Sequence, residues 1–71
     1  MSAYQLPEGI SMRRRYRKSA QKEKMFVEGI NDAIEGRPNL SDDPDLARHQ
    51  GAEVAAAYRA GYKIGRAHLS Y

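Results

Sequence analysis

The sequence predicts an all-α protein, an antiparallel two-helix hairpin with a flexible N-terminal arm. Two long stretches carry apolar residues at helical spacing, which is typical of amphipathic helices. A stretch with proline, glycine and acidic residues separates them, and no stretch carries the signals of a strand. The chain has 71 residues, enough for one small domain over residues 1–71.

The first predicted helix covers residues 12–35 and follows an arm at residues 1–11. The arm contains Pro7 and Gly9 and shows no periodicity, so we expect it to be extended or mobile. Ser11 is a suitable N-cap, and Gly36 is a suitable residue to end the helix. One side of the helical wheel collects Met12, Tyr16, Ser19, Phe26, Val27, Ile30, Ala33 and Ile34.

The second predicted helix covers residues 44–68 and follows an acidic loop at residues 36–43. Asp43 as N-cap, Pro44 at the first helical position and Asp45 in the first turn form a strong start signal. This signal explains the acids of the loop better than a cation site does. The expected apolar face contains Ala47, Gly51, Val54, Tyr58, Gly61, Tyr62, Gly65 and Leu69.

Both predicted helices contain the same short template, an aromatic residue followed by a glycine and then by a second small residue. A glycine inside a helix costs about 1 kcal/mol relative to alanine, which favours a reason such as close helix packing. The template therefore predicts a tight crossing of the two helices. The predicted packing residues are Phe26, Gly29, Ala33, Tyr58, Gly61, Tyr62 and Gly65.

Composition argues against several classes of protein. Without cysteine the chain has no disulfide and no thiolate metal site, and His49 and His68 lack companion ligands. No apolar run approaches the roughly 18 residues of a membrane span, and the N-terminus lacks the apolar core of a signal peptide. No nucleophile motif or phosphate-binding glycine loop is present. We expect a cytoplasmic, non-enzymatic protein without cofactor, metal or membrane partner.

Charge is distributed unevenly along the chain, although the total is only +3. Residues 1–24 carry seven basic and two acidic side chains, whereas residues 25–45 carry one basic and six acidic side chains. The run from Arg13 to Lys18 holds four arginines, one lysine and Tyr16. Arginine forks bind phosphate and an interleaved tyrosine can stack on a base, so this run predicts RNA binding. A solvated leader, a membrane-surface patch and a partner-docking patch are the alternatives.

A second basic stripe lies beside the packing face of the second predicted helix, where alanines separate Arg48, Arg59, Lys63 and Arg66. This stripe would extend the phosphate-binding surface of the leader. The candidate RNA-binding residues are Arg13, Arg14, Arg15, Tyr16, Arg17, Lys18, Lys22, Arg59, Lys63 and Arg66.

The two template segments resemble ribosome modulation factor, a family of small two-helix bacterial proteins. The first segment reads Met25-Phe26-Val27-Glu28-Gly29 through Ala33 to Gly36-Arg37. The second reads Tyr58-Arg59-Ala60-Gly61-Tyr62-Lys63-Ile64-Gly65-Arg66, with tyrosines where the family has tryptophans. The resemblance covers about residues 13–66. It departs from the family at Pro38-Asn39-Leu40, which replaces a Cys-Pro-aromatic element, and in a longer, more acidic connection.

The resemblance implies an antiparallel helical pair that binds ribosomal RNA and promotes inactive ribosome dimers. The leading hypothesis is therefore a non-enzymatic RNA-binding protein that associates with the ribosome and inhibits translation, as hibernation factors do. One rival is a small protein-binding inhibitor or adaptor that uses its acidic loop. The other is a structural helical hairpin that forms homo-oligomers through its glycine faces.

Overall fold

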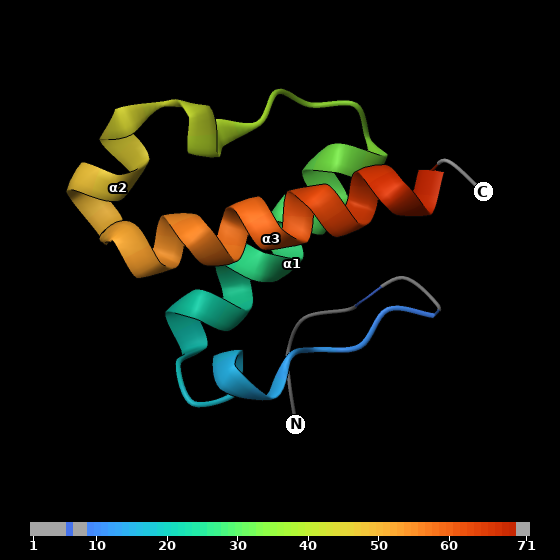
Figure 1. The fold of residues 1–71 in the computed structure, drawn as a ribbon, viewed down its shortest axis with the longest axis horizontal. Coiled ribbons are helices and arrows are strands. Elements are labelled where there is room, and N and C mark those ends of the chain that lie inside the picture. Colours follow the sequence, from blue (N-terminus) through green and yellow to red (C-terminus); the bar gives the residue numbers. More distant parts are fainter. Residues whose placement is uncertain (1–5, 7–8, 70–71) are drawn as a thin grey trace.

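The computed structural model describes residue 6 and residues 9–69, and all regular structure within them is helical (Figure 1). The all-α class is therefore confirmed. Residues 1–5, 7 and 8 of the predicted arm lie outside the described residues. The elements are η1 (Arg14–Tyr16), α1 (Ala20–Ile34), η2 (Leu40–Asp42), α2 (Pro44–Gln50) and α3 (Ala52–Leu69).

The first long helix begins at Ala20, so its predicted start at Met12 is wrong. Ser19 is the N-cap: its backbone is extended, and its hydroxyl accepts a hydrogen bond from the Lys22 N–H at 3.3 Å. Before it, the backbone forms only the single 3-10 turn η1. A serine side chain that bonds to the backbone nearby competes with helix continuation, which is the physical reason for the later start.

The end of α1 follows the prediction. Gly36 has a φ of +78°, and its N–H donates to the Ala33 carbonyl at 3.2 Å. The Arg37 N–H donates to the Asp32 carbonyl at 2.8 Å. These two bonds form a Schellman motif, which satisfies the last carbonyls of the helix.

The second predicted helix is divided into α2 and α3 at Gly51, so the expected continuous helix over residues 44–68 is wrong. Its start is confirmed, because the Asp43 carboxylate accepts a hydrogen bond from the Asp45 N–H at 2.9 Å. Gly51 has a φ of +97°, a conformation that favours glycine and interrupts the helix. Three residues expected on the apolar face are instead exposed, namely Ala47, Gly51 and Leu69.

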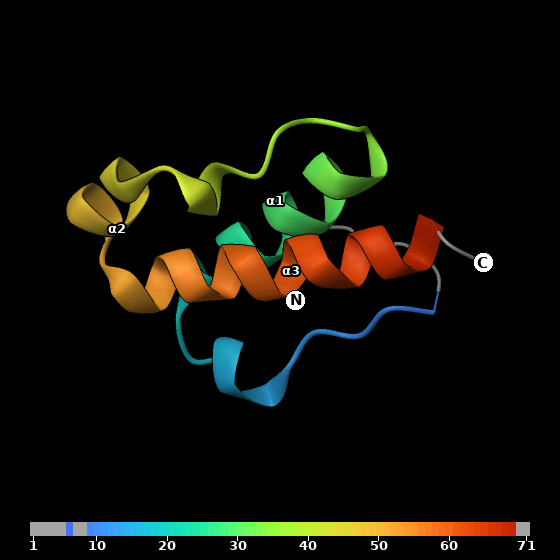
Figure 2. The same cartoon turned by 45° about the horizontal axis from the view of Figure 1, so that its top comes forward.

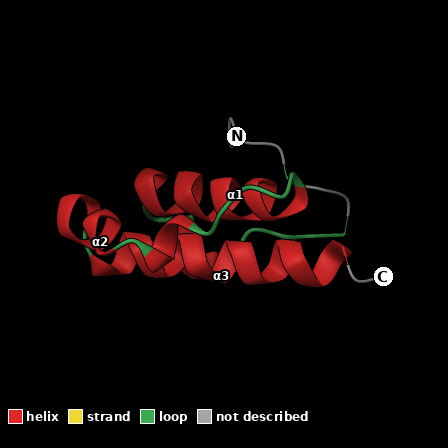
Figure 3. Ribbon diagram, turned by 90° about the horizontal axis from the view of Figure 1, so that it is seen from above, coloured by secondary structure: helices red, strands yellow, loops and turns green. Residues whose placement is uncertain are grey.

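The helices α1 and α3 lie side by side (Figure 3) and run in the same direction (Figure 1), so the predicted antiparallel hairpin is also wrong. Their contacts advance together along both helices: Lys22 pairs with Glu53 near the two starts, and Ala33 approaches Gly65 near the two ends. The physical reason is the connection at residues 35–51. It runs back along the pair, so α3 starts beside the start of α1 (Figure 1).

Backbone contact between α1 and α3 occurs at three glycines. A Cβ atom on Gly29 would lie 2.8 Å from the Tyr62 nitrogen and still closer to the Tyr58 carbonyl oxygen. A Cβ atom on Gly61 would collide with the Phe26 carbonyl oxygen. On Gly65 it would lie 2.5 Å from the Ile30 oxygen. The helices can approach this closely only because side chains are absent at these positions.

The core lies on both sides of this crossing, and η1 and α2 lie on opposite sides of α3 (Figure 2). The cluster on the η1 side contains buried Tyr16, Phe26, Ile30 and Ala57, with Leu6, Ile10 and Met12 packed against it. The cluster on the α2 side contains Met25, Val54 and Tyr58, with Leu46 and Tyr62 beside it. Leu6 and Ile10, expected in a flexible arm, therefore contact the core.

Candidate nucleic-acid interface

Tyr16 anchors the basic leader to the core. Its side chain is only 6% exposed, and its ring centroid lies 5.1 Å from that of Phe26. The ring packs inside the protein, as its place on the apolar side of the predicted helix indicates, so it is not available to stack on an RNA base. This anchoring determines how the neighbouring arginines are presented.

The basic side chains around Tyr16 point to solvent. Because η1 is one turn with its tyrosine directed inward, the flanking residues have no core position to occupy. The exposed residues of the leader are Arg13, Arg14, Arg15, Arg17 and Lys18. The Arg15 guanidinium lies 5.6 Å from the centroid of the Tyr16 ring, within cation–π distance. A buried ring thus supports an exposed cation.

Three further candidate cations lie on the exposed side of α3, away from the glycine crossing. Arg59, Lys63 and Arg66 are exposed. The Arg59 guanidinium donates to the Ser41 hydroxyl and carbonyl at 3.3 and 3.4 Å, so η2 borders this stripe. Arg48, which the sequence placed in the same stripe, belongs instead to α2 and lies 3.6 Å from Asp45.

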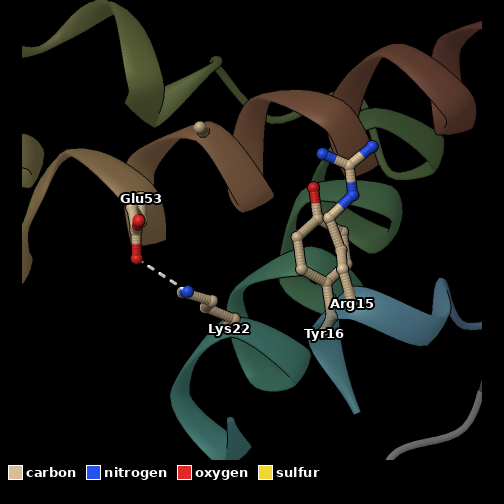
Figure 4. A pocket seen from close by; sticks show the side chains of 5 residues that line it. Arg15, Tyr16, Lys22 and Glu53 are labelled. Carbon is tan, nitrogen blue, oxygen red and sulfur yellow. Dashed lines mark ion pairs between the residues drawn. The ribbon is translucent and has the colours of Figure 1, made fainter. Parts of the chain in front are cut away.

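Two surface hollows connect the leader to the stripe on α3. One lies between η1, α1 and α3 and is lined by Arg15, Tyr16, Lys22, Glu53 and Ala56 (Figure 4). The other is lined by Ser41, Ala47, Ala52, Ala55, Ala56, Arg59, Ala60 and Lys63. Ala56 lines both hollows, so they adjoin on the surface of α3. The fold therefore brings together two basic segments that are far apart in the sequence.

Lys22 and Glu53 form an ion pair across the first hollow. The Lys22 Nζ lies 2.7 Å from a Glu53 carboxylate oxygen. The lysine side chain is 28% exposed and the glutamate 82%. The hydrogen bond from Lys22 lowers the pKa of Glu53 below its ordinary value. Sequence reasoning missed Glu53, because its pairing depends on the parallel packing of α1 and α3.

A second polar cluster lies near the C-terminal end of α1. Asp32 accepts hydrogen bonds from the Tyr58 hydroxyl at 2.5 Å and from the Arg37 Nε at 2.7 Å. The Tyr62 hydroxyl donates to the Arg37 carbonyl at 2.6 Å. Burial and the Asp32 hydrogen bond raise the pKa of Tyr58 well above its ordinary value. This cluster accounts for an acid near the helix C-terminus, where the helix dipole disfavours it.

Two acidic residues of the connection have structural roles. Asp43 caps α2, and Asp45 pairs with Arg48. Asp43 and Asp45 border a third hollow with Leu40, Leu46, His49 and Gln50, in which Leu40 is 46% exposed. Over the described part of the chain, no three or more His, Cys, Asp or Glu side chains gather as metal ligands do.

No protein-family model matches the chain, and neither a curated protein nor a solved structure matches it. Of the helices between residues 9 and 69, none has the length and apolar character needed to cross a membrane. Fold and site together define a small all-α protein with a basic surface built from η1, α1 and α3.

Proposed function

We propose that the protein is a non-enzymatic RNA-binding protein that associates with the ribosome and inhibits translation. The observation that carries this proposal is the junction of the two hollows at Ala56. It joins Arg15 of η1 to Arg59 and Lys63 of α3 in one surface. A continuous basic surface suits a polyanion better than two isolated patches do.

The chemistry of this surface favours contacts to phosphate rather than to bases. Arginine binds phosphate through paired N–H groups, and alanines between the cations let a nucleic-acid backbone approach α3 closely. The aromatic rings nearby are not free to stack: Tyr16 and Tyr58 are buried, and Tyr62 is half-buried and bonded to Arg37. We therefore propose recognition of RNA by its shape and charge, with strong dependence on salt.

The ribosome is proposed as the RNA target because residues 25–37 and 58–66 resemble ribosome modulation factor. Gly29 of the first segment and Gly61 and Gly65 of the second form the α1–α3 crossing, so these resembling residues build the scaffold. The parallel helix pair differs from the antiparallel pair that the resemblance implies. We accordingly propose a ribosomal RNA contact made by this chain's own leader and α3.

The test replaces Arg13, Arg14, Arg15 and Arg17 with alanine and measures co-sedimentation with ribosomes at several salt concentrations. The four side chains are exposed, so circular dichroism should show a folded protein. Binding should weaken strongly. The slope of log affinity against log salt should fall by about 0.7–0.9 for each lost phosphate contact. Arg48→Ala is the control, because Arg48 is an exposed arginine on α2 that lines neither of the two adjoining hollows.

Unchanged affinity and salt slope in the folded four-arginine variant would remove the leader from the interface. Ribosome affinity could also fall in Arg48→Ala by as much as it falls for each arginine of the four-arginine variant. That result would indicate non-specific charge attraction instead of a defined surface. Translation in a cell-free reaction, measured with parent and variant, then shows whether ribosome binding and inhibition are lost together.

A protein-binding function is the second candidate, and one observation favours it. Leu40 is exposed in a hollow that Asp43 and Asp45 border, an arrangement that suits a basic segment with an apolar anchor. Leu40→Ser should abolish such binding and leave RNA binding unchanged. The oligomer hypothesis is weakened, because Gly29, Gly61 and Gly65 are already buried between α1 and α3.

A further inference from the structure

We propose that the hollow between η1, α1 and α3 is a phosphate subsite in which Glu53 holds Lys22 until an RNA phosphate displaces it. The inference rests on the proposed RNA binding and deepens it. It names one phosphate contact and the residue that opposes that contact. Glu53 would thereby limit the affinity of the whole surface.

The hollow has a volume of about 180 Å³ and two cations in its lining. Arg15 and Lys22 supply the positive charge, and Tyr16, Ala56 and Glu53 complete the lining. Figure 4 shows the Arg15 side chain extending from η1 towards α3, and the Lys22 ammonium directed at Glu53. Within this lining Glu53 is the one carboxylate.

The two cations are held in place more firmly than the acid. The buried Tyr16 ring supports the Arg15 guanidinium, and most of the Lys22 side chain is covered. Glu53 is 82% exposed, and Lys22 is the ion-pair partner of its carboxylate. Glu53 can therefore rotate into solvent while the cations stay at the hollow. An incoming anion would meet a prepared pair of cations.

The parallel packing adds a second attraction for anions at this place. Lys22 lies in the first turn of α1 and Glu53 in the first turn of α3. Each helix N-terminus carries the equivalent of about half a positive charge. An acid in this position is favourable, so Glu53 serves as an internal substitute for a phosphate.

Exchange of Glu53 for phosphate loses little, because an exposed ion pair contributes little on its own. A phosphate in the hollow gains Lys22 as a partner and can also accept paired hydrogen bonds from Arg15. The exchange transfers no proton and breaks no covalent bond. It replaces one carboxylate–ammonium pair by a phosphate with two cationic partners.

The experiment measures the affinity of Glu53→Gln for a labelled short single-stranded RNA by fluorescence anisotropy at several salt concentrations. The glutamine keeps the size of the side chain and removes its charge. Affinity should rise about two- to five-fold, the upper part of the range that an exposed ion pair corresponds to. The salt slope should change by less than the roughly 0.7 of one phosphate contact, because a phosphate occupies the hollow in both complexes.

Two matched variants separate this effect from a general change in charge. Glu28→Gln removes the same charge from an acid that pairs with Lys24 and does not line the hollow. Its effect should stay below about two-fold, because Glu28 holds no cation of the hollow. In Lys22→Ala, RNA binding should weaken, and adding Glu53→Gln should no longer raise affinity.

Equal affinities of Glu53→Gln and Glu28→Gln would overturn the inference, as would a gain that persists without Lys22. The four-arginine variant distinguishes the two levels of failure. If that variant loses RNA binding while Glu53→Gln behaves like Glu28→Gln, the subsite fails and the proposed function stands. If the four arginines also have no effect, the proposed RNA binding fails and the subsite fails with it.

Discussion

Two polar clusters contact both α1 and α3, one near each end of the helix pair, and they differ in exposure rather than in distance. Lys22 and Glu53 meet at 2.7 Å near the start, and Arg37 and Asp32 meet at 2.7 Å near the end. The acid of the first pair is 82% exposed, whereas that of the second is 13% exposed. Asp32 also bonds to the buried Tyr58 hydroxyl.

The comparison shows that the length of an ion pair does not indicate its role. A covered acid that satisfies a buried hydroxyl has no water to replace its partners, so its loss leaves an unsatisfied group. An exposed acid exchanges its partner for water at little cost. The Asp32 cluster is therefore suited to holding the fold together, and the Glu53 pair is suited to exchange with a ligand.

The largest effect is expected from Gly61→Leu, which should break both clusters at once. A side chain at residue 61 would collide with the Phe26 carbonyl oxygen and force the helices apart. The cost should reach about 3 kcal/mol, the upper part of the range for overpacking. A domain of this size has only a few kcal/mol of stability, so thermal melting by circular dichroism should show a largely unfolded chain.

Ala67→Leu is the control for Gly61→Leu, because it adds the same side chain to an exposed position on α3. It should melt like the parent. A Gly61→Leu protein with the parent's melting temperature would show that residue 61 is not at the crossing.

Asp32→Ala should give the next largest loss of stability. The change leaves the hydroxyl of Tyr58, a residue with no exposed surface, without its short hydrogen bond. The Pro38 carbonyl, 3.5 Å from that hydroxyl, is then its acceptor at the limit of hydrogen-bond distance, so the cost should approach that of an unsatisfied buried group, about 1–3 kcal/mol. For a domain of this size, each kcal/mol lowers the melting temperature by about 4–8 °C. A variant that melts within 1 °C of the parent, far below the roughly 4 °C expected, would contradict a structural role for Asp32.

Alkaline pH should weaken the same cluster through Tyr58, because its pKa is raised in the folded protein. An unfolded tyrosine ionises near pH 10, whereas the folded one keeps its proton. The contribution of the Tyr58 hydroxyl to the free energy of unfolding is therefore complete below about pH 10. It is lost as pH rises further, and the free energy of unfolding falls by up to about 1.4 kcal/mol per pH unit. Tyr58→Phe should lose stability less steeply between about pH 10 and pH 11. Urea unfolding at each pH provides the measurement, and identical slopes would refute this account.

Much of the fold could be predicted from the sequence because its signals are local. The Asp43–Pro44 start, the Gly36 stop and the apolar spacing each act within one or two helical turns. The break at Gly51 was missed because its position on the helical wheel fitted the apolar face. Only the backbone conformation shows that Gly51 has a positive φ and lies exposed.

The direction of α3 and the candidate site could not be predicted, because both depend on the path of the connection at residues 35–51. A short loop implies a hairpin, but the turn at Gly51 lets residues 35–51 return along the pair. That return is what places Glu53 beside Lys22 and Tyr58 beside Asp32. The exposed arginines and the inward side of Tyr16 could be named from the sequence, whereas the hollow that Arg15 and Tyr16 line with Glu53 depends on the path of the connection.

The smallest effect is expected from a matched pair of amide substitutions, Asp32→Asn and Glu53→Gln, measured by thermal melting at low and high salt. Both remove one charge and keep the side-chain size. Asp32→Asn loses the charge pair with Arg37 beside a buried hydroxyl, so its melting temperature should fall at both salt concentrations. Glu53→Gln should lower the melting temperature less, and only at low salt, because its carboxylate is exposed and salt screens both its pair with Lys22 and the helix dipole. Equal shifts in the two variants would show that both pairs hold the fold together. The Lys22–Glu53 pair would then be no better suited to exchange with a ligand than the Asp32 cluster.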